Sequence, residues 1–327
     1  MMEYRGMKIV VTGGAGFIGS HLVESLLAAG HDVHVVDDLS TGRRSNIAHL
    51  LDNFRGCRLS ACRVSDMPAD GSWLDGVEQV YHLAAAVGVK LIVEQPVRSI
   101  ENNVTQVATL LRQVADRKIP TLIASSSEVY GKSAKVPFCE DDDVVYGSTR
   151  FSRWSYAMSK ALDEYLALAH YQTDGLPVVA ARFFNTVGPG QSGQYGMVVP
   201  RFIAKALSNQ PIEVYGDGRQ TRCFCHVGDV TDALPKLLGR PECHGQVYNL
   251  GSDEEVSIAD LADRVIAMTG SRAGRVNVPY DSAYGSGFDD LTRRVPDLTK
   301  IRAAIGFTPT KKLDDILRQL IRPAGNE

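Results

Sequence analysis

Three residues near the middle of the chain have the types and spacing needed to remove a proton from an alcohol: Ser126, Tyr156 and Lys160. Tyr156 and Lys160 are four residues apart, so in a helix they share one face, one turn apart. A phenol has a pKa near ~10, too high for a base at neutral pH, and a neighbouring ammonium ion favours the phenolate. With Ser126 as a second hydrogen-bonding group, the set suits the loss of a proton from an alcohol whose carbon loses a hydride.

A hydride needs an acceptor, and the N-terminal segment has the features of a dinucleotide site. Residues 9–11 form a β-branched run typical of a buried strand, and a cluster of glycines follows before a helical pattern begins. Glycine lets the backbone approach a pyrophosphate, and a helix N-terminus offers unpaired N–H groups. A second apolar strand ends at Asp37, close to the ~20-residue spacing expected of a carboxylate that binds the ribose of NAD. Arg43 and Arg44 could accept the extra phosphate of NADP, but the acid at the strand end favours NAD.

The composition is that of an ordinary globular protein. The chain has 327 residues, 44% of them apolar and 22% charged, and a net charge of −3, so it offers no basic surface for nucleic acid or an anionic membrane. Its six cysteines show no C-x-x-C pair and no zinc-like spacing with histidine, so we expect reduced thiols, a cytoplasmic location and no metal site. No apolar run approaches the ~20 residues of a membrane span, and residues 1–5 do not resemble a signal peptide.

Apolar strands alternate with helical patterns, which predicts an α/β fold with a Rossmann-type, doubly wound parallel sheet. From Thr186 onward short strands and helices replace this alternation, so we expect a smaller C-terminal α/β lobe that binds a second ligand. The expected domains are residues 1–185, with a strand and a helix returning from about 223–252, and residues 186–327. The expected strands include residues 33–36, 58–64, 79–83, 121–124, 178–184, 222–227 and 246–250, and the expected helices include 96–117, 154–171 and 202–207.

Taken together, the motifs resemble the extended short-chain dehydrogenase/reductase family, in its nucleotide-sugar epimerase/dehydratase group. The resemblance extends over nearly the whole chain and implies an NAD-dependent enzyme that acts on a UDP-sugar. The matching segments are GGAGFIGSHL at 13–22, VDDLSTG at 36–42, HLAA at 82–85, ENNV at 101–104, SSSEVYG at 125–131, the Tyr156–Lys160 pair, RFFN at 182–185, VYGDGRQTR at 214–222 and RRVPD at 293–297.

The resemblance also implies roles for individual residues. It makes Ser126 the catalytic hydroxyl, Tyr156 the base, Lys160 its activator, and Glu128 a further catalytic group. The expected substrate-binding residues are Ser127, Asn185, Val199, Tyr215, Arg222 and Arg294. The expected cofactor-binding residues are Gly13, Gly16, Phe17, Ile18, Gly19, Asp37, Asp38, Ser40, Thr41, Gly42, Asp66, Met67, Leu83, Ala84, Ala85, Asn103, Tyr156 and Lys160. For Asp66 and Met67 two interpretations stay open, a cover for the adenine and a solvated turn.

Enzymes of this group oxidise C4 of the sugar. They differ in the next step, which is dehydration, decarboxylation or epimerisation. Dehydratases usually read Thr-Asp-Glu where this chain has Ser126-Ser127-Glu128, so the missing aspartate argues against dehydration. Glu128 and Arg222 fit a UDP-glucuronate decarboxylase, but residues 188–190 read Gly-Pro-Gly and lack the arginine usual there.

Residues 153–156 and 280–285 look more like those of 4-epimerases. The sequence therefore favours a UDP-sugar 4-epimerase, acting on UDP-glucose and UDP-galactose or on UDP-glucuronate and UDP-galacturonate, with the decarboxylase as the alternative. A non-catalytic dinucleotide sensor is a further alternative, which the intact Tyr156 and Lys160 disfavour. Because the family often dimerises through two helices per subunit, we expect a homodimer formed by residues 96–117 and 154–171.

Overall fold

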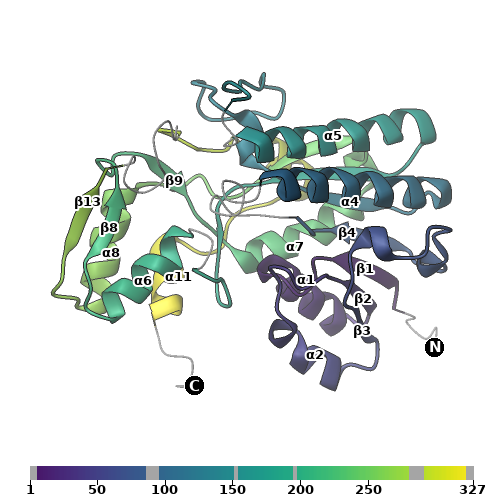
Figure 1. The fold of residues 1–327 in the computed structure, drawn as a ribbon, viewed down its shortest axis with the longest axis horizontal. Coiled ribbons are helices and arrows are strands. Elements are labelled where there is room, and N and C mark those ends of the chain that lie inside the picture. The colour runs from purple at the N-terminus through teal and green to yellow at the C-terminus, as the bar shows by residue number, and fades with distance from the viewer. Residues whose placement is uncertain (1–5, 86–95, 151–153, 194–196, 280–290, 322–327) are drawn as a thin grey trace.

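The computed structural model of the chain describes residues 6–85, 96–150, 154–193, 197–279 and 291–321 (Figure 1). Residues 1–5, Arg153 and residues 280–285, which entered the sequence analysis, lie outside the described residues. None of the described helices is both long enough and apolar enough to cross a membrane.

A seven-stranded parallel sheet forms the larger part of the molecule, with the strand order β11-β6-β5-β4-β1-β2-β3. The order reverses at β1, so the sheet is doubly wound, and this confirms the predicted fold class. Its strands are β1 (Lys8–Thr12), β2 (Asp32–Val36), β3 (Cys57–Ser60), β4 (Gln79–His82), β5 (Thr121–Ser126), β6 (Val178–Phe183) and β11 (Gln246–Leu250).

The strands are apolar on both faces because helices cover both faces. Along β1, Ile9 and Val11 pack in one buried cluster with Leu22 of α1, whereas Val10 packs in a second cluster with Val107 of α4. In Figure 1, α4 and α5 lie on one side of the sheet and α1 and α7 on the other. These layers contain α1 (Phe17–Ala28), α2 (Ala48–Asn53), α4 (Pro96–Arg117), α5 (Ser155–Asp174), α7 (Val227–Leu238) and α10 (Thr299–Ile305).

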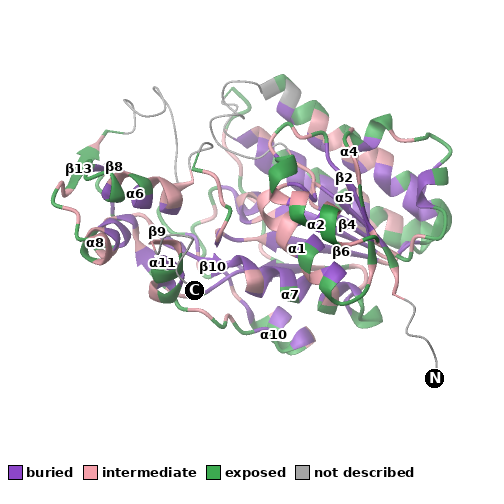
Figure 2. Cartoon of the chain, turned by 90° about the horizontal axis from the view of Figure 1, so that it is seen from below, coloured by how far each residue is buried: buried purple, intermediate pink, exposed green. Residues whose placement is uncertain are grey.

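A second, smaller hydrophobic core lies in the other part of the molecule, where Phe202, Val214, Leu261 and Ile316 pack together. Figure 2 shows the buried residues in purple, concentrated in the sheet and on the inner faces of the helices. The division at residue 185 stays a prediction. The elements here are α6 (Val198–Leu207), α8 (Ile258–Thr269), α11 (Leu313–Ile321), β8 (Ile212–Tyr215) paired with β13 (Arg275–Val278), β9 (Thr221–Cys223) paired with β12 (Glu255–Ser257), and β7 (Thr186–Val187) paired with β10 (Cys225–His226).

Three boundaries differ from the predicted ones for physical reasons. The third strand ends at Ser60 rather than residue 64, because its partner β2 ends there, with Val36 paired to Ser60. The strand predicted at 222–227 is two short strands, since β9 pairs with β12 and β10 pairs with β7. Helix α6 begins at Val198, before Pro200, because the first turn of a helix tolerates proline.

A buried ion pair ties α5 to the sheet below the strand ends. Arg182 of β6 donates from Nη2 to Glu164 Oε2 at 2.8 Å and from Nε to Glu164 Oε1 at 3.0 Å, and Ser125 of β5 donates to the same carboxylate. The Arg182 guanidinium also lies 4.7 Å from the centre of the Tyr130 ring. Glu164 is therefore the point at which two strands and one helix are joined.

We predict that Arg182→Met destabilises the fold strongly, because it leaves the Glu164 charge buried without its cation. The free energy of unfolding in urea should fall by about 3–5 kcal/mol. Arg318→Met is the matched control, since Arg318 pairs with Asp315 on the exposed surface of α11, and it should change stability by less than about 0.5 kcal/mol. Equal losses in the two variants would contradict a structural role for the Arg182–Glu164 pair.

Candidate active site

A cavity of about 810 Å³ lies at the carboxyl ends of the parallel strands and extends to the smaller core. Val36 of β2, Ser126 of β5 and Phe183 of β6 line it from the sheet, and Val199 of α6 and Ile258 of α8 line it from the other side. In open α/β sheets, ligands bind at this edge, where the strand order reverses.

The glycine turn after β1 forms one wall of the cavity. Gly13 has a φ of +70°, and a Cβ there would lie 2.6 Å from the backbone nitrogen of Ala84. A Cβ on Gly19 would lie 2.1 Å from the carbonyl oxygen of Gly13, so this close approach requires glycine. Gly16 is the N-cap of α1 and makes no side-chain capping bond. The first turn of α1 therefore offers backbone N–H groups to an anion, and the residues fit a dinucleotide.

Asp37 lies at the end of β2 with a fixed carboxylate. It accepts hydrogen bonds from the backbone N–H groups of Ala15 and Leu39, both at 2.9 Å. Burial raises the pKa of Asp37, and these two bonds partly offset the rise. Gly42 packs behind the carboxylate rather than in the cavity, since a Cβ on Gly42 would lie 2.9 Å from Asp37 Oδ2. The backbone thus aims the acid at the place where a ribose is expected.

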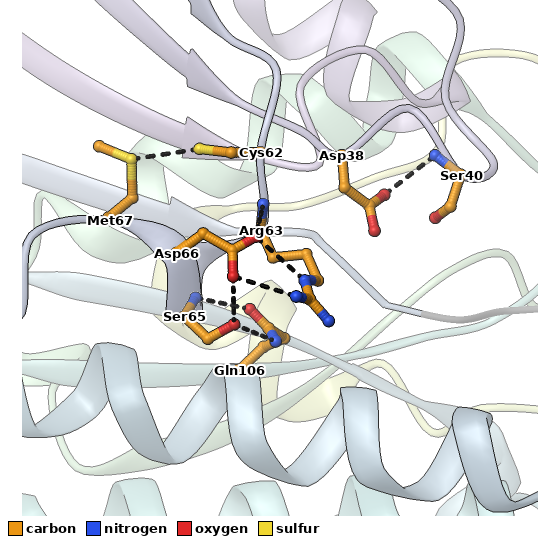
Figure 3. Close-up of polar contacts among 8 residues, drawn as sticks. All are labelled: Asp38, Ser40, Cys62, Arg63, Ser65, Asp66, Met67 and Gln106. Atoms are coloured by element: carbon orange, nitrogen blue, oxygen red, sulfur yellow. Dashed lines mark hydrogen bonds and ion pairs between the residues drawn. The ribbon is translucent and has the colours of Figure 1, made fainter.

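The turn after β3 contains Asp66 and Met67, for which the sequence left two interpretations open (Figure 3). Asp66 accepts hydrogen bonds from Nε and Nη2 of Arg63, at 3.0 and 3.1 Å. The bonding to Arg63 lowers the pKa of Asp66. The Met67 sulfur lies 3.4 Å from the Cys62 sulfur. Neither residue lines the cavity; Arg63 and Val64 do so in their place. The i,i+3 spacing of Arg63 and Asp66 was the sequence signal for this turn, in which Arg63 rather than Asp66 lines the cavity.

The remaining expected cofactor residues all line the cavity. Asp38 lies near Ser40, whose backbone N–H donates to Asp38 Oδ1 at 2.9 Å, as Figure 3 also shows. These cavity-lining residues are Gly13, Gly16, Phe17, Ile18, Gly19, Asp37, Asp38, Ser40, Thr41, Leu83, Ala84, Ala85, Asn103, Tyr156 and Lys160.

The structure brings Ser126 and Tyr156 together at the buried end of the cavity. Burial raises the pKa of Tyr156, the nearby carboxylates of Glu128 and Asp163 raise it further, and the bond with Ser126 lowers it. Lys160 donates to the carbonyl oxygen of Ala124 at 2.9 Å and to Asp163 Oδ2 at 3.1 Å. Lys160 is therefore held by β5 and by its own helix, and Asp163 is a partner that the sequence analysis missed.

An ion pair between Glu128 and Arg294 lies beside this centre. The distance from Arg294 Nη2 to Glu128 Oε1 is 2.7 Å, and both side chains are largely buried. Both residues line the cavity, together with Ser127. The Nε atom of Arg294 is buried and has no hydrogen-bond partner in the part of the chain that the structure describes. The pair thus places a fixed charge of each sign at the reactive end.

The far end of the cavity contains the residues expected to hold a nucleotide diphosphate. Arg222 donates from Nη1 to the carbonyl oxygens of Thr221 and Leu291, at 2.8 and 2.9 Å, which fixes its guanidinium. The Arg201 guanidinium lies 4.1 Å from the centre of the Tyr215 ring. Asn185, Val199, Tyr215, Arg222 and Arg294 all line the cavity, and so do Arg201 and Gln220, which the sequence analysis missed.

The chain is similar to enzymes that act on nucleotide sugars. The sequence model of a family described as the NAD dependent epimerase/dehydratase family matches residues 9–251. A UDP-N-acetyl-alpha-D-glucosaminuronate decarboxylase of Bacillus cytotoxicus is 38% identical over 96% of this chain and 97% of its own length. UDP-glucuronic acid decarboxylase 1 of Arabidopsis thaliana is 32% identical over 96% of this chain and 69% of its own length.

Solved structures of epimerases have the same fold. UDP-glucuronic acid 4-epimerase of Bacillus cereus, in complex with UDP-glucuronic acid and NAD, superimposes with a TM-score of 0.86 at 26% identity, over 96% of this chain and 98% of the other. UDP-N-acetylglucosamine 4-epimerase of Methanobrevibacter ruminantium gives a TM-score of 0.87 at 27% identity, over 97% of both chains.

Proposed function

Because the chain belongs to the NAD-dependent epimerase/dehydratase family, we propose that it is a decarboxylase that acts on a UDP-linked hexuronate. It oxidises C4 of the sugar and releases the C5 carboxylate as CO2. The cofactor of the family is NAD, and the glycine turn with Asp37 fits it. The observation that carries the proposal is the Glu128–Arg294 ion pair beside Tyr156 in the cavity.

The names of the two relatives support a carboxylated substrate. The Bacillus protein is named for UDP-N-acetylglucosaminuronate and the Arabidopsis protein for UDP-glucuronic acid, and both sugars are uronates. A uronate in this cavity needs a cation near C5. Arg294 is a cation that lines the reactive end of the cavity, whereas residues 188–190 lack an arginine.

The residues of the site have distinct tasks in this reaction. NAD held by the glycine turn and Asp37 would supply the hydride acceptor for C4. Tyr156 takes the proton of the C4 hydroxyl while Ser126 hydrogen-bonds the same oxygen. The product of this step is a β-keto acid, since the new C4 ketone is next to the carbon that bears the carboxylate. When the C5–carboxylate bond breaks, CO2 leaves and its electron pair forms an enolate, whose oxygen Tyr156 and Ser126 stabilise.

Glu128 and Arg294 act on the carboxylate. Arg294 donates to it and holds the C5–carboxylate bond in place, and the ion pair with Glu128 fixes the plane of the guanidinium. Glu128 adds a negative charge next to an anion that becomes neutral CO2, so its charge favours the decarboxylated state. A proton from solvent water then takes the place of CO2 at C5, and return of the hydride to C4 would give a UDP-pentose.

A UDP-sugar 4-epimerase is the second candidate, favoured by the structural similarity to the Bacillus cereus and Methanobrevibacter epimerases. In that reaction Tyr156 and Ser126 act in the same way, and the ketone turns over before the hydride returns. The two candidates differ in whether C5 keeps its carboxylate.

Product analysis distinguishes them. Purified protein is incubated separately with UDP-glucuronate, UDP-N-acetylglucosaminuronate, UDP-glucose and UDP-galactose, and the products are identified by NMR and mass spectrometry. We expect CO2 and a UDP-pentose from at least one uronate, and no reaction of UDP-glucose. Formation of a C4 epimer with no loss of CO2 would overturn the decarboxylase and establish the epimerase.

Within this reaction, Glu128→Gln should lower the rate of CO2 release by about 10²-fold, because it keeps a hydrogen bond to Arg294 but removes the charge. Glu242→Gln is the matched control, since Glu242 is exposed and pairs weakly with Arg240, and its rate should stay within about twofold of the wild type. An unchanged rate in Glu128→Gln would remove Glu128 from its role.

We also infer that the protein is a homodimer joined through α4 and α5. These two helices lie side by side in both views (Figures 1 and 2). Large apolar side chains on both are exposed to solvent. Leu162 is 49% exposed and Tyr165 is 69% exposed on α5, and Val97 is 65% exposed on α4. Contact between the same pair of helices in two copies would bury these side chains in a four-helix bundle.

Leu162→Glu should therefore convert the dimer to a monomer in sedimentation-velocity experiments, because a buried carboxylate without a cation opposes association. Leu207→Glu is the control: Leu207 is 58% exposed on α6, away from this pair of helices, and the variant should remain dimeric. A wild-type monomer, or a dimeric Leu162→Glu variant, would exclude this interface.

A further inference from the structure

Lys160 and Asp163, both on α5, form a buried ion pair. Lys160 lies one helical turn after Tyr156. The Nζ–Oδ2 distance is 3.1 Å, and both side chains are 2% exposed. An ammonium group has three N–H bonds, and two of them go to Asp163 and to the carbonyl oxygen of Ala124. Lys160 also lines the cavity, so the third bond is available to a ligand there. The pair thus sets both the position and the direction of the ammonium group.

The groups around this pair leave Asp163 as the counter-ion of Lys160. From β4, His82 is fully buried, and burial together with Lys160 lowers the pKa of His82 to about 3, so this ring carries no charge at neutral pH. On α5, Glu164 is neighbour to Asp163 but is neutralised by Arg182. From the turn after β5, Glu128 faces Tyr156 and is paired with Arg294. Among the described residues, Lys160 is the cation within ion-pair distance of Asp163.

Buried ammonium groups are not stable on their own. Moving one out of water disfavours the charged form, by several kcal/mol when no partner is present, and the group tends to release its proton. The side chain of Lys160 is 2% exposed, so it is almost fully removed from water. Lys160 can activate Tyr156 only while it carries a charge, because a neutral amine does not favour the phenolate.

We propose that Asp163 is a positioning residue of the active site, whose carboxylate keeps the ammonium group of Lys160 charged and directed at Tyr156 and the cofactor. The proposal rests on the proposed function only in requiring that Tyr156 deprotonates an alcohol. Asp163 does not touch the substrate; it acts through Lys160.

The direct test observes the charge of Lys160. Protein labelled with 13C at the lysine Cε is titrated from pH 6 to pH 9.5 by NMR, and the Lys160 signal is assigned by its loss in Lys160→Met. In the wild type we expect the signal of an ammonium group over the whole range. In Asp163→Asn we expect it to change to that of a neutral amine within the range, since asparagine keeps the shape but removes the charge. An ammonium signal throughout in Asp163→Asn overturns the proposal.

The kinetic test uses whichever UDP-sugar the wild type turns over, at saturating NAD. At pH 8, kcat/KM of Asp163→Asn should be at least about tenfold below the wild type and should recover to within about threefold at pH 6, where the amine regains its proton. Asp163→Glu restores the charge and should restore the wild-type profile. The proposal is overturned if the dependence of kcat/KM on pH is unchanged in Asp163→Asn, or if only its low-pH side shifts.

Two further variants show whether a changed result comes from misfolding. The NMR titration covers the case in which the substrate is wrong. Asp163→Ser is a smaller neutral variant with the same expected result, in case Asp163→Asn does not fold. Asp174→Asn is the matched control, because Asp174 lies on the same helix but pairs with His170 near the surface, and its profile should equal the wild type. If the wild type turns over no UDP-sugar, the proposed function fails, while the NMR titration still decides the role of Asp163.

Discussion

Among the described residues, three carboxylates lie in the interior around Tyr156, and each is balanced by a cation of its own. Glu164 is paired with Arg182, Asp163 with Lys160, and Glu128 with Arg294. Because an unpaired buried charge is strongly unfavourable, these pairs determine where the segments that carry them can lie. The first ties α5 to β6, the second fixes the ammonium group within α5, and the third brings residue 294 to the end of β5. The reactive end of the cavity depends on this balance of charge.

The parallel sheet provides the frame on which these pairs are assembled. Reversal of the strand order at β1 opens the edge where the glycine turn, Asp37 and Ser126 meet. The same edge receives Tyr215 and Arg222 from the smaller core, so one cavity is lined both by the glycine turn and by these two residues.

Most of the fold and part of the candidate site could be predicted from local sequence patterns. The β-branched run before Gly13, the acid after β2 and the spacing of Tyr156 and Lys160 are each set within a few neighbouring residues. Contacts that depend on tertiary packing could not be found in this way. The partner of Glu128 is 166 positions away in the chain at Arg294, and Arg63 enters the cavity only because Asp66 holds its guanidinium. Asp163 was present in the same helix pattern, but nothing in that pattern showed that its side chain is buried against Lys160.

The central claim is that the sugar loses a hydride at C4 and regains the same hydride within one binding event. The most direct measurement starts from UDP-glucuronate deuterated at C4 and follows the label in the product by NMR and mass spectrometry. The account predicts that the deuterium stays at C4 of the product and that none appears in water. Loss of the label to solvent would contradict it. Product formation by Tyr156→Phe without any reaction at C4 would contradict it as well.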